Sequence, residues 1–223
     1  MSKAEPDQSS GIGRRRESAK RERSPAWLER RDEVLTAAAE VFRRKGFSGT
    51  SVTDIATHLG VNQSNVYYYF GKKEEIFLTL VQQAVEYNVA EAEAAAASKA
   101  SAVDRLERVV VSLADSYDRH YPFMHLYVQE DVRRLATPGS EADTYLKECA
   151  RRYEAAVRKI ASQGIRSGEF KPDLDAGMLT RAVLGSVNWM HRWFEPGHGE
   201  TGEEVGREFS RMMLGGLAAE KRQ

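Results

Sequence analysis

The chain has 223 residues, in which 33 Lys and Arg balance 33 Asp and Glu, and 41% of the residues are hydrophobic. This length allows one large core or two smaller ones. No apolar run approaches the roughly 20 residues that span a bilayer, and residues 1–20 contain no hydrophobic signal core. We therefore expect a cytoplasmic protein that makes no contact with a membrane.

The zero net charge conceals a local excess of positive charge near the N-terminus. Residues 11–31 carry many more basic than acidic side chains, a distribution expected when only one part of a protein touches phosphate. Residues 1–24 are polar and lack apolar periodicity, which predicts a disordered arm. The composition of this arm fits either contact with a DNA minor groove and neighbouring phosphates or a solubilising tail.

The segment after the arm begins with two predicted helices. The fold is expected to begin near Pro25, and apolar residues then recur at helical spacing from Val34 until Gly46 ends the pattern. Ser51 and Asp54 then have the spacing of a capping box, in which a hydroxyl accepts a backbone N–H bond and an acid follows in the first turn. A short second helix is therefore expected after Ser51.

A third helix should follow almost immediately. Gly60 is expected to end the second helix, and Asn62 supplies an N-cap for a third helix that reaches about Phe70. Two short helices joined by so tight a turn are typical of a helix-turn-helix. We assign residues 25–72 to this domain.

Helical periodicity continues from residue 73 to the C-terminus, and no segment alternates cleanly enough to predict a strand. Two long helices are expected near the end of the chain, at about Asp175–Phe194 and Glu203–Leu217. The predicted fold class is all-α, with an N-terminal three-helix domain followed by a larger helical domain over residues 73–223.

The third helix has the composition of a recognition helix. Such a helix presents short polar side chains to base edges and hydrogen-bond donors to phosphates. Gln63, Ser64 and Asn65 occupy its first turn, where amide side chains can bond adenine in the major groove. Of the three tyrosines that follow, at least one must pack, and Val66 and Phe70 are expected in the core.

These residues carry a resemblance to TetR-family regulators. The resemblance is borne by Thr50–Glu75, which read TSVTDIATHLGVNQSNVYYYFGKKEE, and by AEVFRRKGF, which begins at Ala39. It covers about Arg31–Leu80, with agreement at both core and DNA-facing positions. It implies base contacts by Gln63, Ser64, Asn65 and Tyr68, and DNA-backbone contacts by Ser51, Thr53, Tyr67, Tyr69 and Lys73. Many members have a small residue and then Thr where this chain has Ser64 and Asn65, so different operator bases are expected.

Beyond residue 80 the resemblance is looser and rests on the helix count and the residues GEFKPD, which begin at Gly168. It implies that residues 73–223 form a ligand-binding and dimerisation domain whose last two long helices make a four-helix interface with a second subunit. The alternative is that the same apolar stripes face the subunit's own core. A two-fold dimer predicts a palindromic operator. The interface would be formed by small residues and an apolar filling, namely Gly185, Ser186, Gly215, Gly216, Val183, Met190, Phe209, Met212 and Met213.

Two aromatic clusters are either core or the lining of a ligand pocket. The first surrounds Pro122 and the second lies near the end of the penultimate helix. The segment NWMHRWFEP, from Asn188, resembles that of a TetR branch that controls fatty-acid and sterol catabolism and responds to acyl-CoA thioesters. This implies a small hydrophobic effector, with Arg192 meeting a phosphate or carboxylate. The candidate ligand-binding residues are Tyr117, Tyr121, Met124, Tyr127, Trp189, Arg192 and Trp193.

The principal prediction is a homodimeric repressor that a small hydrophobic ligand releases from operator DNA. An activator and a ligand-independent regulator have the same DNA-binding domain and stay open as alternatives. An enzyme is a further alternative, but the chain contains no HExxH pair, triad order or glycine-rich phosphate loop. We therefore predict no catalytic residue, no metal site and no cofactor. The single cysteine, Cys149, is expected to be a small buried hydrophobe.

Overall fold

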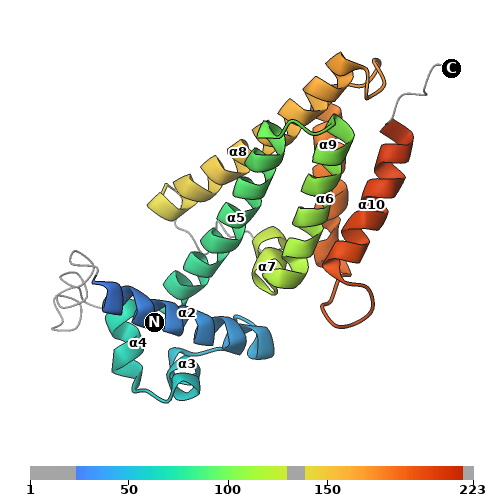
Figure 1. The fold of residues 1–223 in the computed structure, drawn as a ribbon. Helices are drawn as coiled ribbons and strands as arrows, with labels where there is room; N and C mark the ends of the chain where they lie inside the picture. Colours follow the sequence, from blue (N-terminus) through green and yellow to red (C-terminus); the bar gives the residue numbers. More distant parts are fainter. Residues whose placement is uncertain (1–23, 130–138, 218–223) are drawn as a thin grey trace. The chain divides into compact units, whose positions relative to one another are not determined.

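In the computed structural model the described residues are 24–129 and 139–217. The predicted N-terminal arm therefore lies outside them except for Ser24. The described residues form helices and contain no strand (Figure 1), which confirms the predicted all-α class. The elements are α2 (Pro25–Lys45), α3 (Val52–Leu59), α4 (Gln63–Tyr69), α5 (Lys73–Ala97), α6 (Ala102–Arg119), α7 (Phe123–Gln129), α8 (Glu141–Ser167), α9 (Ala176–Asn188), the 3-10 helix η2 (Trp189–Arg192) and α10 (Gly202–Leu217).

The chain divides into two compact units after Leu80, inside α5, rather than at the expected residue 72. The first turns of α5 complete the core of the N-terminal unit, because Ile76 and Phe77 are fully buried there. The Phe77 ring meets the Phe42 ring edge to face, with 5.6 Å between the ring centroids. The rest of α5 belongs to the larger unit.

Capping residues define the helices of the N-terminal unit. Ser51 and Asp54 form the capping box that was predicted, and Gly60 ends α3 in the left-handed conformation at φ 69°. That conformation favours glycine because a Cβ would be strained there. Asn62 occupies the N-cap position of α4, but its side chain makes no capping hydrogen bond. The helix-turn-helix therefore has the expected boundaries.

The larger unit is a helical bundle in which α6 packs against α8, α9 and α10. Two glycines of α10 permit a close approach to α6: a Cβ at Gly206 would lie 2.7 Å from Val111 Cα, and one at Gly202 would lie 2.6 Å from the Ala114 carbonyl oxygen. Neither glycine was singled out by its sequence, because helical periodicity does not indicate which neighbour comes closest.

The end of the penultimate helix differs from the prediction. It begins about where expected, with Asp175 as its N-cap, but the α-helix ends at Asn188 and continues as the 3-10 helix η2. Val183 and Met190, expected in a subunit interface, are instead buried in the core of their own unit. Periodicity predicts that a residue is buried without telling which partner covers it.

No helix within the described part of the chain is long and apolar enough to cross a membrane. Within the same residues, no group of three or more His, Cys, Asp or Glu side chains could hold a metal ion.

Candidate nucleic-acid interface and ligand cavity

The first turn of α4 presents its polar side chains to solvent. Gln63, Ser64 and Asn65 are all exposed, whereas the next residue, Val66, is completely buried. Phe70, just beyond the helix, is also buried, which confirms both predicted core positions. The apolar side of α4 thus anchors the helix, and the opposite side carries groups that can donate to and accept from base edges.

The three tyrosines of α4 are all half-buried, and they differ in their contacts. Tyr69 packs against Trp27 with 5.7 Å between ring centroids, and burial raises the pKa of its hydroxyl. The Tyr67 hydroxyl accepts a hydrogen bond from Gln63 Nε2 at 3.3 Å. Tyr68 meets Tyr69 edge to face at 4.9 Å. The expectation that one tyrosine packs is met by Tyr69.

The start of α3 is a compact polar network. The Ser51 hydroxyl donates to the Asp54 carboxylate at 2.6 Å, and the Asp54 backbone N–H donates to that hydroxyl at 3.2 Å. Lys45 Nζ also donates to this carboxylate, at 2.6 Å. The Lys45 bond, followed by the bonds from Ser51, holds the pKa of Asp54 well below its usual range. Ser51 and Thr53 are exposed at this helix end, where backbone N–H groups favour anions.

The resemblance assigns Lys73 to the DNA backbone, but its side chain already makes hydrogen bonds within the protein. Its ammonium group donates to the carbonyl oxygens of Phe47, at 2.9 Å, and Thr50, at 2.8 Å. It also lies 4.6 Å from the centre of the Phe47 ring. The side chain thus joins the start of α5 to the loop between α2 and α3, a contact that only the folded chain reveals.

Replacing Lys73 with Met should lower the free energy of unfolding of the N-terminal unit by about 2 kcal/mol, because two charge-assisted hydrogen bonds are lost and two carbonyls are left without them. Native-state hydrogen exchange of the α2 and α3 amides measures this change. Lys72→Met is the matched control, since Lys72 is exposed, and its stability should stay unchanged. Equal stability of the two variants would contradict the structural role of Lys73.

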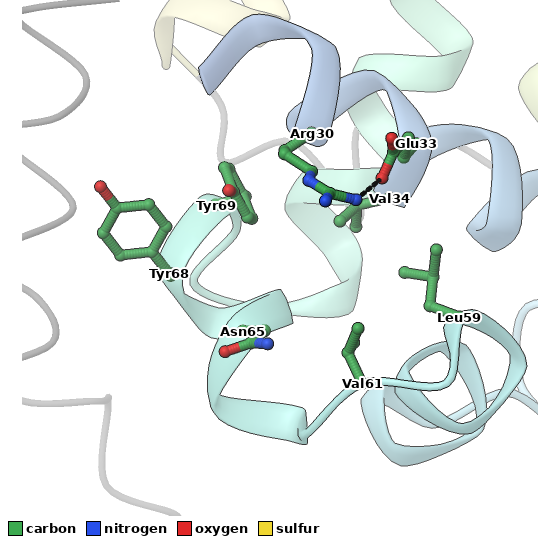
Figure 2. A pocket seen from close by; sticks show the side chains of 8 residues that line it. All are labelled: Arg30, Glu33, Val34, Leu59, Val61, Asn65, Tyr68 and Tyr69. Carbon is green, nitrogen blue, oxygen red and sulfur yellow. Dashed lines mark hydrogen bonds and ion pairs between the residues drawn. The ribbon is translucent and has the colours of Figure 1, made fainter. Parts of the chain in front are cut away.

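A pocket of about 320 Å³ lies beside α4 in the N-terminal unit. Figure 2 shows Arg30 and Glu33 on α2 joined by a hydrogen bond, with Asn65 and Tyr68 projecting from α4. The Arg30–Glu33 distance is 2.7 Å and both side chains are exposed. Arg30 lies in the basic segment recognised in the sequence, but nothing there indicated that it borders the same pocket as Asn65.

The larger unit contains a second cavity, of about 140 Å³. Its lining comes from five helices, α5 to α9, and is mostly apolar. Of the seven candidate ligand-binding residues, only Met124 and Tyr127 line it. Cys149 also borders it and is buried, as predicted, and burial raises the pKa of its thiol. The lining residues are Val85, Asn88, Val89, Leu113, Met124, Tyr127, Cys149, Ala150, Tyr153, Leu184 and Asn188.

The other five candidates lie elsewhere. Tyr117 is fully buried in the core, and its hydroxyl donates to the Asn188 backbone carbonyl at 3.2 Å. The Tyr121 ring packs edge to face on His125 at 4.8 Å. Trp189 is 60% exposed and Trp193 49% exposed.

Arg192 is likewise exposed, 5.6 Å from the Trp189 ring centre. The structure thus separates Trp189, Arg192 and Trp193 from the cavity that Met124 and Tyr127 line. The helix α9 ends at Asn188, so these three residues lie beyond the α-helix that was expected to contain them.

Two family profiles match the chain. Residues 34–80 match the profile described as bacterial regulatory proteins, tetR family, and residues 99–217 match the one described as tetracyclin repressor-like, C-terminal domain. The second match lies within the larger unit, in which the resemblance seen in the sequence was loose.

Several known proteins are similar to the chain over most of its length. The HTH-type transcriptional repressor KstR2 of Mycobacterium tuberculosis is 28% identical over 191 residues, which is 86% of this chain and 94% of that protein. The solved structure of this ketosteroid transcriptional regulator has a TM-score of 0.74 and covers 86% of this chain and 96% of its own.

Two further proteins are similar to the chain. The TetR family transcriptional regulator PfmR from Thermus thermophilus is 32% identical, with a TM-score of 0.73 and coverage of 83% of this chain and 99% of its own. The fatty acid metabolism regulator protein of Bacillus subtilis is 24% identical over 159 residues, which is 70% of this chain and 78% of that protein.

Proposed function

Because the chain belongs to the TetR family and is a DNA-binding transcriptional regulator, we propose that it is a homodimeric repressor released from a palindromic operator by a small hydrophobic ligand. The observation that supports the DNA-binding role is that the polar first turn of α4 is exposed, whereas the next residue, Val66, is buried. A cytoplasmic location accompanies this proposal.

Base contacts in the proposed complex come from Gln63, Ser64, Asn65 and Tyr68. Contacts with the DNA backbone come from Ser51, Thr53, Tyr67, Tyr69 and Lys73, to which we add Arg30. The Arg30 guanidinium is exposed and bonded to Glu33, and exposed ion pairs contribute little stability. A DNA phosphate can therefore take the place of the Glu33 carboxylate. Lys73 would have to give up its carbonyl partners to reach a phosphate, which makes its role in binding secondary to its role in the fold.

Dimerisation is supported by the exposed apolar side chains of α9, η2 and α10. Met178 and Met212 are each 61% exposed, and Trp189 and Trp193 are 60% and 49% exposed. Exposed large apolar and aromatic side chains are typical of protein interfaces. Gly185, Gly215 and Gly216 also face open space, since a Cβ at any of them would meet no atom within 4 Å. They leave room for a second subunit to come close.

The ligand site in this proposal is the cavity of the larger unit. Its apolar lining suits a hydrophobic ligand, and relatives are named after ketosteroid and fatty-acid regulation. An acyl-CoA thioester is one version of the effector. Arg192 lies outside the cavity lining, so it would meet a CoA phosphate or carboxylate at the surface.

Coupling between ligand and DNA needs an element that belongs to both units. The helix α5 is such an element, since it begins in the N-terminal unit and supplies Val85, Asn88 and Val89 to the cavity. A ligand that binds better to one placement of α5 favours that placement. The protein is released from the operator if its conformation with the favoured placement of α5 binds DNA less tightly.

The test is the affinity of the full chain for DNA from its own promoter region, with and without a panel of hydrophobic metabolites and their CoA esters. We expect specific binding that one compound class abolishes. Specific binding that no compound weakens would favour the ligand-independent regulator, and the absence of specific binding would contradict the operator assignment. Transcription from the same promoter in vitro separates repression from activation.

A further inference from the structure

Two polar side chains in the cavity of the larger unit have unused hydrogen-bonding atoms. The Oδ1 atom of Asn88 and the hydroxyl of Tyr153 are buried and find no partner among the described residues. Asn88 Nδ2 donates to Met124 Sδ, at 3.5 Å, and a thioether is a weak acceptor. Buried polar atoms are nearly always satisfied, so these two require an explanation.

The surroundings of Asn88 and Tyr153 favour a ligand as that explanation. Asn88 comes from α5 and Tyr153 from α8, and the remaining lining is largely aliphatic. An apolar cavity with a few polar groups is the usual form of a small-molecule site. Another polar lining residue, Asn188, already accepts a bond from the Tyr117 hydroxyl, at 3.3 Å to its Oδ1. Asn88 and Tyr153 are therefore lining residues whose buried polar atoms have no partner among the described residues.

The two atoms specify the chemistry of a ligand group. Asn88 Oδ1 can only accept, so the ligand must donate to it. Tyr153 can donate, and burial raises the pKa of its hydroxyl and keeps it neutral. A hydroxyl group satisfies both, because it donates one hydrogen and accepts another. A carboxylate has no hydrogen to donate, and no Lys or Arg stands among the described residues that line the cavity to offset its charge.

The size of the cavity limits the size of the apolar part of the ligand. Its volume is about 140 Å³, and an apolar cavity of about 150 Å³ is known to hold one benzene molecule. A single six-membered ring or a short branched chain fits this space, whereas a long extended chain does not.

We propose that this cavity binds a neutral, ring-sized apolar group bearing a hydroxyl, which donates to Asn88 Oδ1 and accepts from the Tyr153 hydroxyl. This inference specifies the chemical class of the effector. That the bound ligand acts as an effector rests on the proposed function. A larger metabolite would enter with such a group at its leading end.

The test is a ligand-detected NMR titration of the full chain, without DNA, using phenol, cyclohexanol and benzoate as probes. Phenol and cyclohexanol should bind at least about tenfold more tightly than benzoate, since the carboxylate leaves Asn88 Oδ1 unpaired and brings a charge into the cavity. Equal affinities, or no binding of either hydroxylated probe, would overturn the inference.

Two variants then test the contacts of Tyr153 and Asn88 separately. Tyr153→Phe should weaken phenol binding about tenfold without lowering the melting temperature, because the hydroxyl it removes has no partner among the described residues. The matched control is Tyr145→Phe, which removes the same atom from the same helix outside the cavity lining. Asn88→Leu is the second variant, and it should bind benzene more tightly than phenol. Unchanged phenol affinity in both cavity variants would contradict the inference.

The operator assay separates this inference from the proposed function. Hydroxylated probes that bind in the expected order but never release DNA would support the ligand class and contradict ligand-relieved repression. Release of DNA by compounds that bind independently of Asn88 and Tyr153 would support the repressor and overturn the assignment of the cavity.

Discussion

Replacing Asn65 with Ala should lower operator affinity about tenfold to a hundredfold while leaving the salt dependence of binding unchanged. An amide bonded to a base edge discriminates by about 1–3 kcal/mol and releases no counterion. Asn65 is exposed in the first turn of α4, and the buried Val66 keeps that turn in place. The loss should be confined to the operator, with affinity for a random duplex unchanged.

Arg30→Ala is the informative comparison for Asn65→Ala. It should weaken binding to operator and random duplex alike and reduce the slope of log affinity against log salt by about 1, because one phosphate contact is lost. Fluorescence anisotropy over a series of salt concentrations measures both variants. Arg151→Ala serves as the charge-matched control, since Arg151 is exposed on α8 and paired with Glu148. A reduced salt slope for Asn65→Ala would contradict its assignment to a base.

Trp189→Asp should convert the proposed dimer to a monomer and lower operator affinity about a hundredfold or more, because two linked recognition helices bind far more tightly than one. The Trp189 ring is 60% exposed, so the charge disturbs a subunit interface more than the core. Met212→Asp places the same charge on α10 and should have the same effect. Sedimentation velocity measures the oligomeric state, and circular dichroism verifies that the helices remain.

Ala155→Asp is the control for these two variants, since Ala155 is exposed on α8. It should leave both the dimer and DNA binding intact. A dimer that persists in Trp189→Asp and Met212→Asp would place the interface elsewhere.

The recognition helix could be predicted in some detail because its signals are local. Capping by Ser51, the left-handed Gly60 and the apolar positions Val66 and Phe70 all act within a few residues of chain. They determine where α3 and α4 begin and end, and hence which residues stand in the exposed first turn. The resemblance to the TetR family depended on the same short segment.

The role of Lys73 could not be predicted, although its position in the motif was known. Its partners, the carbonyls of Phe47 and Thr50, are more than 20 residues earlier in the chain. A lysine next to a recognition helix suggests phosphate contact by its charge alone. Only the folded unit reveals that backbone oxygens already satisfy it.

The cavity was the least predictable feature, because five helices contribute to it. Asn88 and Tyr153 carry no motif, and the conspicuous Trp189 and Trp193 lie on the surface instead. The sequence by itself determined the helices, the family and the exposed polar turn of α4, since hydrogen bonding and amphipathic spacing within a helix are local. Tertiary structure alone decided which apolar faces are core, cavity or exposed surface, because that choice depends on which distant helices pack together.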